Sequence, residues 1–328
     1  VTFQIFGSAG EPISKQSDTS AAVAQRLAQT RSLMSREGID AYLVPSADPH
    51  LSEYLPGYWQ GRQWLSGFHG SVGTLIITQI FAGVWGDSRY WEQATKELAG
   101  SGIELVKLQP GQQGPLEWLA EQAKADTVVA VDGAVLAVAS SRTLASKLYE
   151  CGARLRTDLD LLTELWHDRP ALPTNLVYEH LPPQASGGRV EKLARLRQVI
   201  TERGADWHFI ATLDDIAWLF NLRGADVYYN PVFISFALIG PESVSLFVDS
   251  KKIDARVRQS LEQDGITLVE YTQIGVALRE VPKDGRLLID PARVTCGLLD
   301  YLDAEVSLVE GLNPTTLFKS RKTEADTA

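Results

Sequence analysis

Histidines and clustered carboxylates are the side chains of this chain that could bind a metal or carry out acid–base chemistry. A metal-dependent hydrolase needs His, Asp and Glu ligands drawn into one cavity. None of the histidines stands in HxH or HxxxH spacing; they are His50, His69, His167, His180 and His208. We therefore expect His50, which follows Asp48-Pro49, to be a hydrogen-bonded turn residue, and His208 to be a core or interdomain residue. Solvent exposure is expected for His167 and His180, and no metal site is expected within this chain.

Other candidate motifs have structural explanations. Asp214-Asp215 could be a carboxylate pair, but the pair precedes an apolar run at a predicted strand end, so we favour a helix N-cap. The glycine-rich stretch 67–73 lacks the Gly-Lys-Ser/Thr of a phosphate loop, and we predict a turn leading into a strand. Cys151 and Cys296 have neither CxxC spacing nor a neighbouring histidine, so both are predicted to be buried structural thiols. No nucleophile elbow occurs, and no catalytic residue is predicted.

The aromatic stretch over residues 54–64 is harder to assign. It places Arg62 and two glutamines among tyrosines and tryptophans. Aromatic residues with Arg are typical of interface hot spots. A contact with a partner or substrate and simple packing are equally open interpretations.

Composition excludes several classes of protein. The 328 residues are 45% hydrophobic and 22% charged, which indicates about two globular domains. Forty-one acidic against 31 basic residues give a net charge of −10, and the basic residues are scattered. We expect neither nucleic acid nor a membrane surface as a partner. The absence of a signal sequence or a long apolar run, with only two cysteines, predicts a cytoplasmic protein.

Helices and strands alternate along the chain. A first helix is predicted from the N-caps at residues 18–20 to the stop at Gly38. Further helices are predicted over 90–98, 116–125, 141–150, 190–203 and 252–263. Strands are predicted over 41–44, 74–78, 82–85, 104–107, 127–131, 207–211, 232–239, 244–248, 267–270 and 286–289. Prolines between residues 169 and 183 predict an extended linker between two α/β domains.

The second half of the chain repeats the first. The difference in residue number between matching positions, the offset, takes three values. It is 166 for Arg26-Leu-Ala with Lys192-Leu-Ala, and for Gly38, Asp40 and Asp48 with Gly204, Asp206 and Asp214. It is 154 for Trp64-Leu65 and Gly70 with Trp218-Leu219 and Gly224, and 162 for Asp87-Ser-Arg89 with Asp249-Ser-Lys251. Loop insertions produce such shifts. The sequence therefore predicts two related domains in tandem, each a mixed β-sheet flanked by helices.

Several specific strings stand out in both halves of the chain: Ser46-Ala-Asp-Pro-His50, Ser52-Glu-Tyr54, Trp64-Leu-Ser-Gly-Phe68, Trp85 with Asp87-Ser-Arg-Tyr90, Thr212-Leu-Asp-Asp-Ile-Ala-Trp-Leu-Phe-Asn-Leu-Arg-Gly224 and Asn230-Pro-Val232. With these strings the chain resembles the aminopeptidase P family, in its long, three-domain, cytosolic branch of the creatinase/prolidase metallopeptidases. The resemblance runs from about residue 23 to residue 319. It implies that the chain consists of the two creatinase-N-terminal-like domains of an Xaa-Pro aminopeptidase. Such an enzyme removes the N-terminal residue of a peptide when proline is the second residue.

The resemblance also implies what this chain lacks. In the family, two Asp, one His and two Glu hold a dinuclear Mn or Zn centre in a pita-bread domain that begins near Lys319. No position here matches those ligands, so the chain alone is expected to be inactive. The expected boundaries are a flexible arm over 1–18, a first domain over 19–168, a Pro-rich linker over 169–188, a second domain over 189–318, and the truncated start of a catalytic domain over 319–328.

The resemblance implies a gating and dimerising role for the two domains. Arg62, with His69 behind it, is the residue that we expect to reach substrate, whereas Asp87, Arg89 and Tyr90 are expected to hold a strand-to-helix turn. The expected partners are the chain's own C-terminal catalytic domain, a second copy in a homodimer, and peptides with proline at position two. The alternatives are a free-standing scaffold protein and the N-terminal part of a creatinase-type amidinohydrolase.

Overall fold

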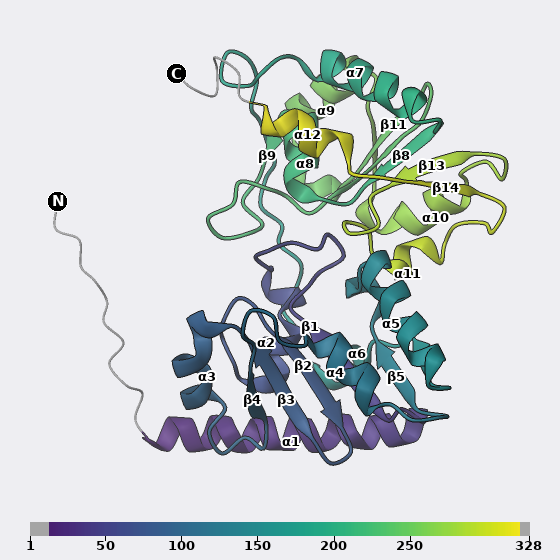
Figure 1. Ribbon diagram of the computed structural model, residues 1–328. Helices are drawn as coiled ribbons and strands as arrows, with labels where there is room; N and C mark the ends of the chain where they lie inside the picture. Colours follow the sequence, from purple (N-terminus) through teal and green to yellow (C-terminus); the bar gives the residue numbers. More distant parts are fainter. Residues whose placement is uncertain (1–12, 322–328) are drawn as a thin grey trace, which may run out of the picture.

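The computed structural model describes residues 13–321 and contains two α/β domains, one above the other in Figure 1. The first has a six-stranded sheet of order β4-β3-β2-β1-β5-β6. Its strands are β1 (Ala41–Pro45), β2 (Thr74–Thr78), β3 (Ala82–Gly86), β4 (Glu104–Lys107), β5 (Val128–Val131) and β6 (Arg154–Arg156). Its helices are α1 (Ile13–Glu37), α2 (Gly61–Ser66), α3 (Trp91–Glu97), α4 (Pro115–Gln122), α5 (Val138–Glu150) and α6 (Leu161–Leu165). The sheet is mixed, because β1, β2 and β3 are antiparallel and the outer strands join in parallel.

The second domain repeats this topology, with sheet order β12-β11-β10-β8-β13-β14. Its strands are β8 (Trp207–Ile210), β10 (Phe236–Ile239), β11 (Val244–Phe247), β12 (Thr267–Val269), β13 (Arg286–Ile289) and β14 (Ser307–Glu310). Its helices are α7 (Arg189–Glu202), α8 (Leu213–Leu219), α9 (Ala255–Gln263), α10 (Ile274–Arg279), α11 (Cys296–Leu299) and α12 (Pro314–Ser320). The same alternation of antiparallel and parallel pairs recurs. The predicted tandem of related α/β domains is confirmed.

Equivalent side chains perform equivalent tasks in the two domains. Arg26 donates to the Trp64 carbonyl at 2.6 Å and lies over the Trp64 ring. Lys192 donates to the Trp218 carbonyl at 2.9 Å and lies over the Trp218 ring. In each case a basic residue of the domain's first helix anchors the next helix. The matching residues of the sequence repeat therefore make the same contacts in both domains.

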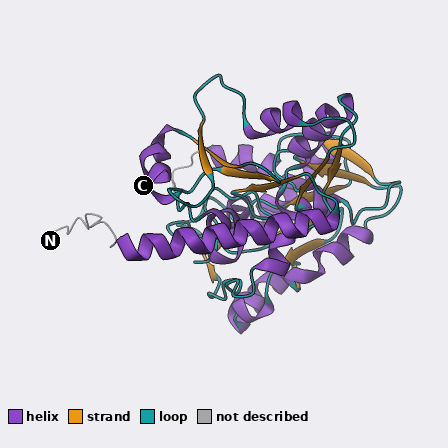
Figure 2. Ribbon diagram, turned by 90° about the horizontal axis from the view of Figure 1, so that it is seen from below, coloured by secondary structure: helices purple, strands orange, loops and turns teal. Residues whose placement is uncertain are grey.

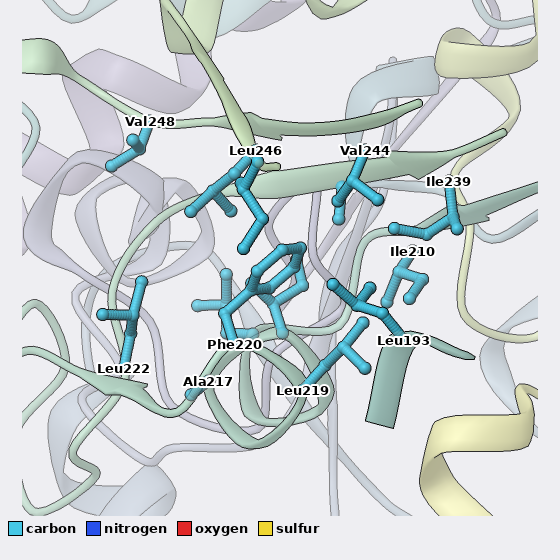
Figure 3. Close-up of a cluster of buried hydrophobic side chains, with 14 of the residues drawn as sticks. Leu193, Ile210, Ala217, Leu219, Phe220, Leu222, Ile239, Val244, Leu246 and Val248 are labelled. Atoms are coloured by element: carbon cyan, nitrogen blue, oxygen red, sulfur yellow. The ribbon is translucent and has the colours of Figure 1, made fainter. Parts of the chain in front are cut away.

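Each sheet buries apolar side chains on both faces, as a sheet covered by helices requires. Figure 3 shows one cluster of the second domain, where Phe220, at the end of α8, packs near Leu246 and Val244 of β11. In the first domain α1 covers the sheet with Val23, Leu27 and Met34, and Figure 2 shows this helix crossing the underside of the molecule. Within the described range 13–321, every helix is too short or too polar to cross a bilayer.

Several predicted boundaries differ from the structure. Helix α1 begins at Ile13, inside the predicted arm, because neither Pro nor Gly interrupts residues 13–37 and interior Asp, Thr and Ser cost little. Residues 1–12, and most of the predicted segment 319–328, lie outside the described residues. Strand β10 starts at Phe236 rather than at residue 232. The reason is that the Ile234 N–H donates to the Asp226 carboxylate and not to a backbone carbonyl of a neighbouring strand.

The predicted Pro-rich linker is attached to the second domain. It contributes β7 (Tyr178–Glu179), which pairs with β9 (Leu222–Arg223). The Val177 N–H also donates to the carbonyl of Lys252 at 2.8 Å. The sequence prediction missed both short strands, together with β6, β14, α2, α6, α10, α11 and α12. Elements of two to seven residues carry too little periodicity to stand out from a loop.

The two domains meet where the short helix η3 (Gly133–Val135) packs on α11. Gly133 and Gly297 approach so closely that a Cβ on Gly297 would lie 2.8 Å from the Gly133 carbonyl carbon. The N–H groups of Val138 and Ala139, at the start of α5, donate to Val294 and Pro291 carbonyls across the junction, both at 2.9 Å. First-turn N–H groups have no partner within their own helix, so the second domain supplies the acceptors for α5.

Candidate functional site

Two loops from different domains form a cleft at their junction. One is the first-domain loop 46–60 between β1 and α2, extended by the turn 69–71; the other is the second-domain loop 224–235 that follows β9. The space between them is about 770 Å³, part of it open to solvent. We call it the interdomain cleft; its principal side chains are Glu53, Tyr54, Trp59, Arg62, His69, Tyr228 and Tyr229. Both residues predicted to reach substrate, Arg62 and His69, therefore line the same cleft.

Arg62 is buried in the wall of this cleft, with 4% of its surface exposed. Its guanidinium donates to the Ser46 hydroxyl at 2.9 Å and to the carbonyls of Phe68 and Gly70. Burial lowers the pKa of Arg62 to about 10 because no carboxylate touches it. The side chain thus fixes the turn after α2. Its contact with substrate stays a prediction.

His69 is the more accessible of the two predicted residues. Its side chain is 55% exposed, and Nδ1 lies 3.4 Å from a Glu97 carboxylate oxygen. Its backbone N–H donates to the other Glu97 oxygen at 2.8 Å. The glutamate therefore holds His69 at the mouth of the cleft, where the imidazole can donate or accept a hydrogen bond. A substrate contact for His69 also stays a prediction.

The aromatic stretch 54–64 divides between two roles. Tyr54 and Trp59 line the cleft, and Tyr54 is half exposed. Trp64 instead stacks on Trp166 with ring centroids 5.1 Å apart. Packing therefore applies to Trp64, and a contact of Tyr54 and Trp59 with a partner or substrate stays a prediction.

The sequence analysis missed Tyr228 and Tyr229. Both are almost fully exposed, at 87% and 106%, and Tyr229 has φ = +60°, a strained conformation for an aromatic residue. One signal was available: between the matches at offsets 154 and 162 the second domain holds 8 more residues than the first. That insertion contains the tyrosine pair.

The predicted structural roles can be checked directly. Asp87 accepts from the Arg89 N–H at 3.0 Å and caps the short helix η2 (Ser88–Tyr90), as predicted. The acidic pair is a correction: Thr212 is the N-cap of α8, and Asp214 and Asp215 occupy its first turn. Asp215 is buried and accepts from the Thr212 hydroxyl at 2.6 Å.

The remaining candidates are structural. His208 is a core residue, bonded to the Leu288 carbonyl and to Asn313. His50 is a hydrogen-bonded turn residue as predicted, but its ring lies between the domains. Both cysteines are free and only partly buried, which corrects the prediction of buried thiols. Burial nevertheless raises the pKa of Cys296, which lies against Gly133 at the domain junction.

Comparison with known families decides the relationship. Residues 26–163 and residues 168–326 each match a model of the creatinase/prolidase N-terminal domain. The chain belongs to the creatinase/prolidase N-terminal domain family. The two matched regions are the two α/β domains, so this family domain occurs twice in tandem here.

Relatives with the same pair of creatinase/prolidase N-terminal domains carry a common name. The chain is 40% identical over 252 residues to a probable Xaa-Pro aminopeptidase P of Aspergillus niger, which covers 76% of this chain and 41% of the relative. A probable Xaa-Pro aminopeptidase P of Ajellomyces capsulatus is 34% identical over 317 residues, covering 92% of this chain and 51% of the relative. The chain thus spans about two fifths to one half of the curated relatives that it matches.

A solved structure resembles both creatinase/prolidase N-terminal domains together. The X-prolyl aminopeptidase of Caenorhabditis elegans, described as a cytosolic enzyme with a di-nuclear active site, has a TM-score of 0.86 and 25% identity. The match covers 93% of this chain and 52% of that one. The arrangement of the two domains therefore recurs in a protein with distant sequence.

The metal-ligating side chains of these two domains do not fit the dinuclear Mn or Zn centre that the resemblance to the family implies. Between residues 13 and 321, no three His, Cys, Asp or Glu side chains gather so that they could hold a metal ion. The buried carboxylates have other partners, as when Asp226 pairs with Lys252.

Proposed function

We propose that this chain is the non-catalytic N-terminal portion of an Xaa-Pro aminopeptidase, and that its interdomain cleft helps to select peptides with proline at position two. The proposal is supported by the names of the relatives that share both domains. In the whole enzyme we place the dinuclear Mn or Zn centre in a C-terminal catalytic domain, and we expect a cytoplasmic homodimer.

One observation carries the selection role: the two loops that differ most between the related domains meet at the cleft. The exposed large hydrophobic side chains of these loops are all tyrosines, with Tyr54 on one wall and Tyr228 and Tyr229 on the other. Aromatic grooves bind the flat, extended shape of proline-containing peptides at low entropic cost. Loops on a rigid scaffold are also where binding residues concentrate.

The decisive experiment compares this 328-residue chain with the full-length product of its gene in an Xaa-Pro peptide cleavage assay, with Mn or Zn added. Cleavage by the full-length protein alone is the expected result. Cleavage by the chain itself would overturn the non-catalytic assignment. Inactivity of both would favour the scaffold alternative, and activity on creatine would favour the amidinohydrolase.

The cleft can be tested separately in the full-length enzyme. Y228A, Y229A and H69A are expected to raise KM for Xaa-Pro peptides about fivefold each, the effect of losing roughly 1 kcal/mol of contact. Y149A is the control, since Tyr149 is 83% exposed on α5 and lies outside the cleft. Unchanged kinetics in all three cleft variants, and in R62A, would remove the substrate role.

A further inference from the structure

His50 belongs to the first domain, but its ring is enclosed by the second. The side chain is 1% exposed. Its Nδ1 lies 2.8 Å from the carbonyl of Ala211, directly after β8, and its Nε2 lies 3.0 Å from the hydroxyl of Tyr271 in the short helix η5 (Tyr271–Gln273). The ring also packs on Phe236 of β10, with centroids 4.4 Å apart. Three separate elements of the second domain thus hold one side chain of the first.

The loop that delivers His50 is fixed from within. One oxygen of the buried Asp48 carboxylate accepts the N–H groups of His50 at 3.0 Å and Ser52 at 2.9 Å. Leu51, between them, has φ = +52°, which costs a non-glycine residue free energy and persists only where its surroundings impose it. The same loop continues to Tyr54 and Trp59. His50 is therefore tied to one wall of the interdomain cleft.

The hydrogen bonds fix which nitrogen of the neutral ring carries the hydrogen. The Ala211 carbonyl can only accept, so Nδ1 donates to it, and in the neutral ring Nε2 accepts from the Tyr271 hydroxyl. Burial lowers the pKa of His50, against the opposing effect of the Asp48 carboxylate on its own loop. From the second domain, the charged groups that face it are Asp226, which raises the pKa, and Lys252, which lowers it. These two are paired with each other.

We propose that His50 is a proton-sensitive latch between the two domains: the neutral ring holds them in the arrangement seen here, and protonation favours their separation. His50 is a positioning residue, because it acts on the cleft through the loop that carries Tyr54 and Trp59. The inference rests on contacts within this chain and stands apart from the proposed function. A failed cleavage assay would leave it intact.

The direction of the pH effect follows from linkage. In a separated state His50 regains an ordinary pKa near 6.5, so this state takes up a proton that the closed state excludes. The equilibrium constant for opening then rises between pH 7.5 and pH 5.5, by at most about tenfold. Asp132, at the same junction, acts in the opposite direction, because burial raises its pKa to about 6. The effect of His50 is therefore measured as a ratio between variants that all retain Asp132.

The experiment is hydrogen–deuterium exchange of the 328-residue chain at pH 5.5 and 7.5, corrected for intrinsic exchange rates. The amides of Val138, Ala139 and Cys296 are the reporters, since each donates to a carbonyl across the junction. The exchange ratio of wild type to H50N should rise on acidification, by at most about tenfold. H208N is the matched control, because His208 is equally buried but lies inside one domain. It should behave as the wild type does.

Equal pH dependence in wild type and H50N, or its loss in H208N as well, would overturn the latch. If H50N does not fold, ¹⁵N spectra of the wild-type imidazoles decide instead. The expected result is an Nδ1–H tautomer for His50 at pH 7.5, and proton uptake that coincides with faster exchange of the three reporter amides. A His50 ring that titrates near pH 6.5 while those amides stay protected would contradict the proposal.

Discussion

The two domains have the same sheet order but place their insertions differently. Between Asp40 and Trp64 the first domain has 12 more residues than the second between Asp206 and Trp218, since the offset falls from 166 to 154. After α8, which is equivalent to α2, the second domain has 8 more residues than the first, since the offset rises from 154 to 162. These two insertions meet at the interdomain cleft. The comparison teaches that the sheet is the shared frame and that unequal loops create the site.

Two buried cations, one from each domain, are stabilised in different ways. The first domain surrounds Arg62 with neutral oxygens from Ser46, Phe68 and Gly70. The second domain pairs Lys252 with Asp226, both at most 6% exposed. Loss of the donor to a buried neutral acceptor lowers the free energy of unfolding less than loss of the counter-ion of a buried charge. The first two predictions use that difference.

The largest effect is expected for K252M in the second domain. The substitution leaves the Asp226 carboxylate buried without its counter-ion, and the free energy of unfolding should fall by about 3–5 kcal/mol. Urea unfolding followed by circular dichroism measures it. The double variant K252M/D226L should recover most of the loss, and K283M, at a surface pair, should change stability by less than about 1 kcal/mol. Equal losses in K252M and K283M would contradict the prediction.

A smaller loss is expected for R62M in the first domain. It leaves the Phe68 and Gly70 carbonyls and the Ser46 hydroxyl without a donor, but it unpairs no charge. The free energy of unfolding should fall by about 2–3 kcal/mol, again by urea unfolding. R89M is the control, because Arg89 is exposed and its ion pair with Asp87 lies at the surface. An R62M variant as stable as R89M would show that the turn holds without the guanidinium.

Next in size is a pH effect at Asp132, which follows β5 and caps η3. Burial, and to a smaller extent Asp160, raise its pKa to about 6, above the value of about 3.9 in an unfolded chain. The folded state therefore binds this proton more tightly, and Asp132 adds about 1 kcal/mol of stability as the pH falls from 7 to 5. D132N should lose that gain in urea midpoints at the two pH values. D290N is the control, because Asp290 follows β13 in the second domain as Asp132 follows β5 in the first. This variant should keep the gain in stability between pH 7 and pH 5.

The smallest effect tests the equivalence of the repeats. Asp40 accepts from the Val128 N–H at 2.8 Å, and Asp206 accepts from the Arg286 N–H at 3.1 Å, in each case at the start of the next parallel strand. D40A and D206A should each lower the free energy of unfolding by less than about 1 kcal/mol and by similar amounts. A loss more than twice as large in one domain would show that the match is one of sequence alone.

Local patterns predicted the longer elements well. Strands such as β1, β2 and β13 appear as short apolar runs, and Gly38 and Gly204 end their helices with φ = +65° and +75°. The N-cap of α8 was assigned two residues too late, because Thr212 and Asp214 are both acceptable caps and the end of β8 decides between them. The site was found only in part. Arg62 and His69 were singled out, whereas Tyr228 and Tyr229 were not.

The sequence by itself determined the duplicated α/β frame, because apolar periodicity and glycine stops act over a few residues and recur at measurable offsets. The tertiary structure alone decided that loops from different domains meet at one cleft, that Arg62 faces carbonyls, and that His50 is enclosed by the other domain. These contacts join residues up to 221 positions apart, as in the bond between His50 and Tyr271. Local propensity carries no information over that separation, since such contacts depend on how two finished domains pack.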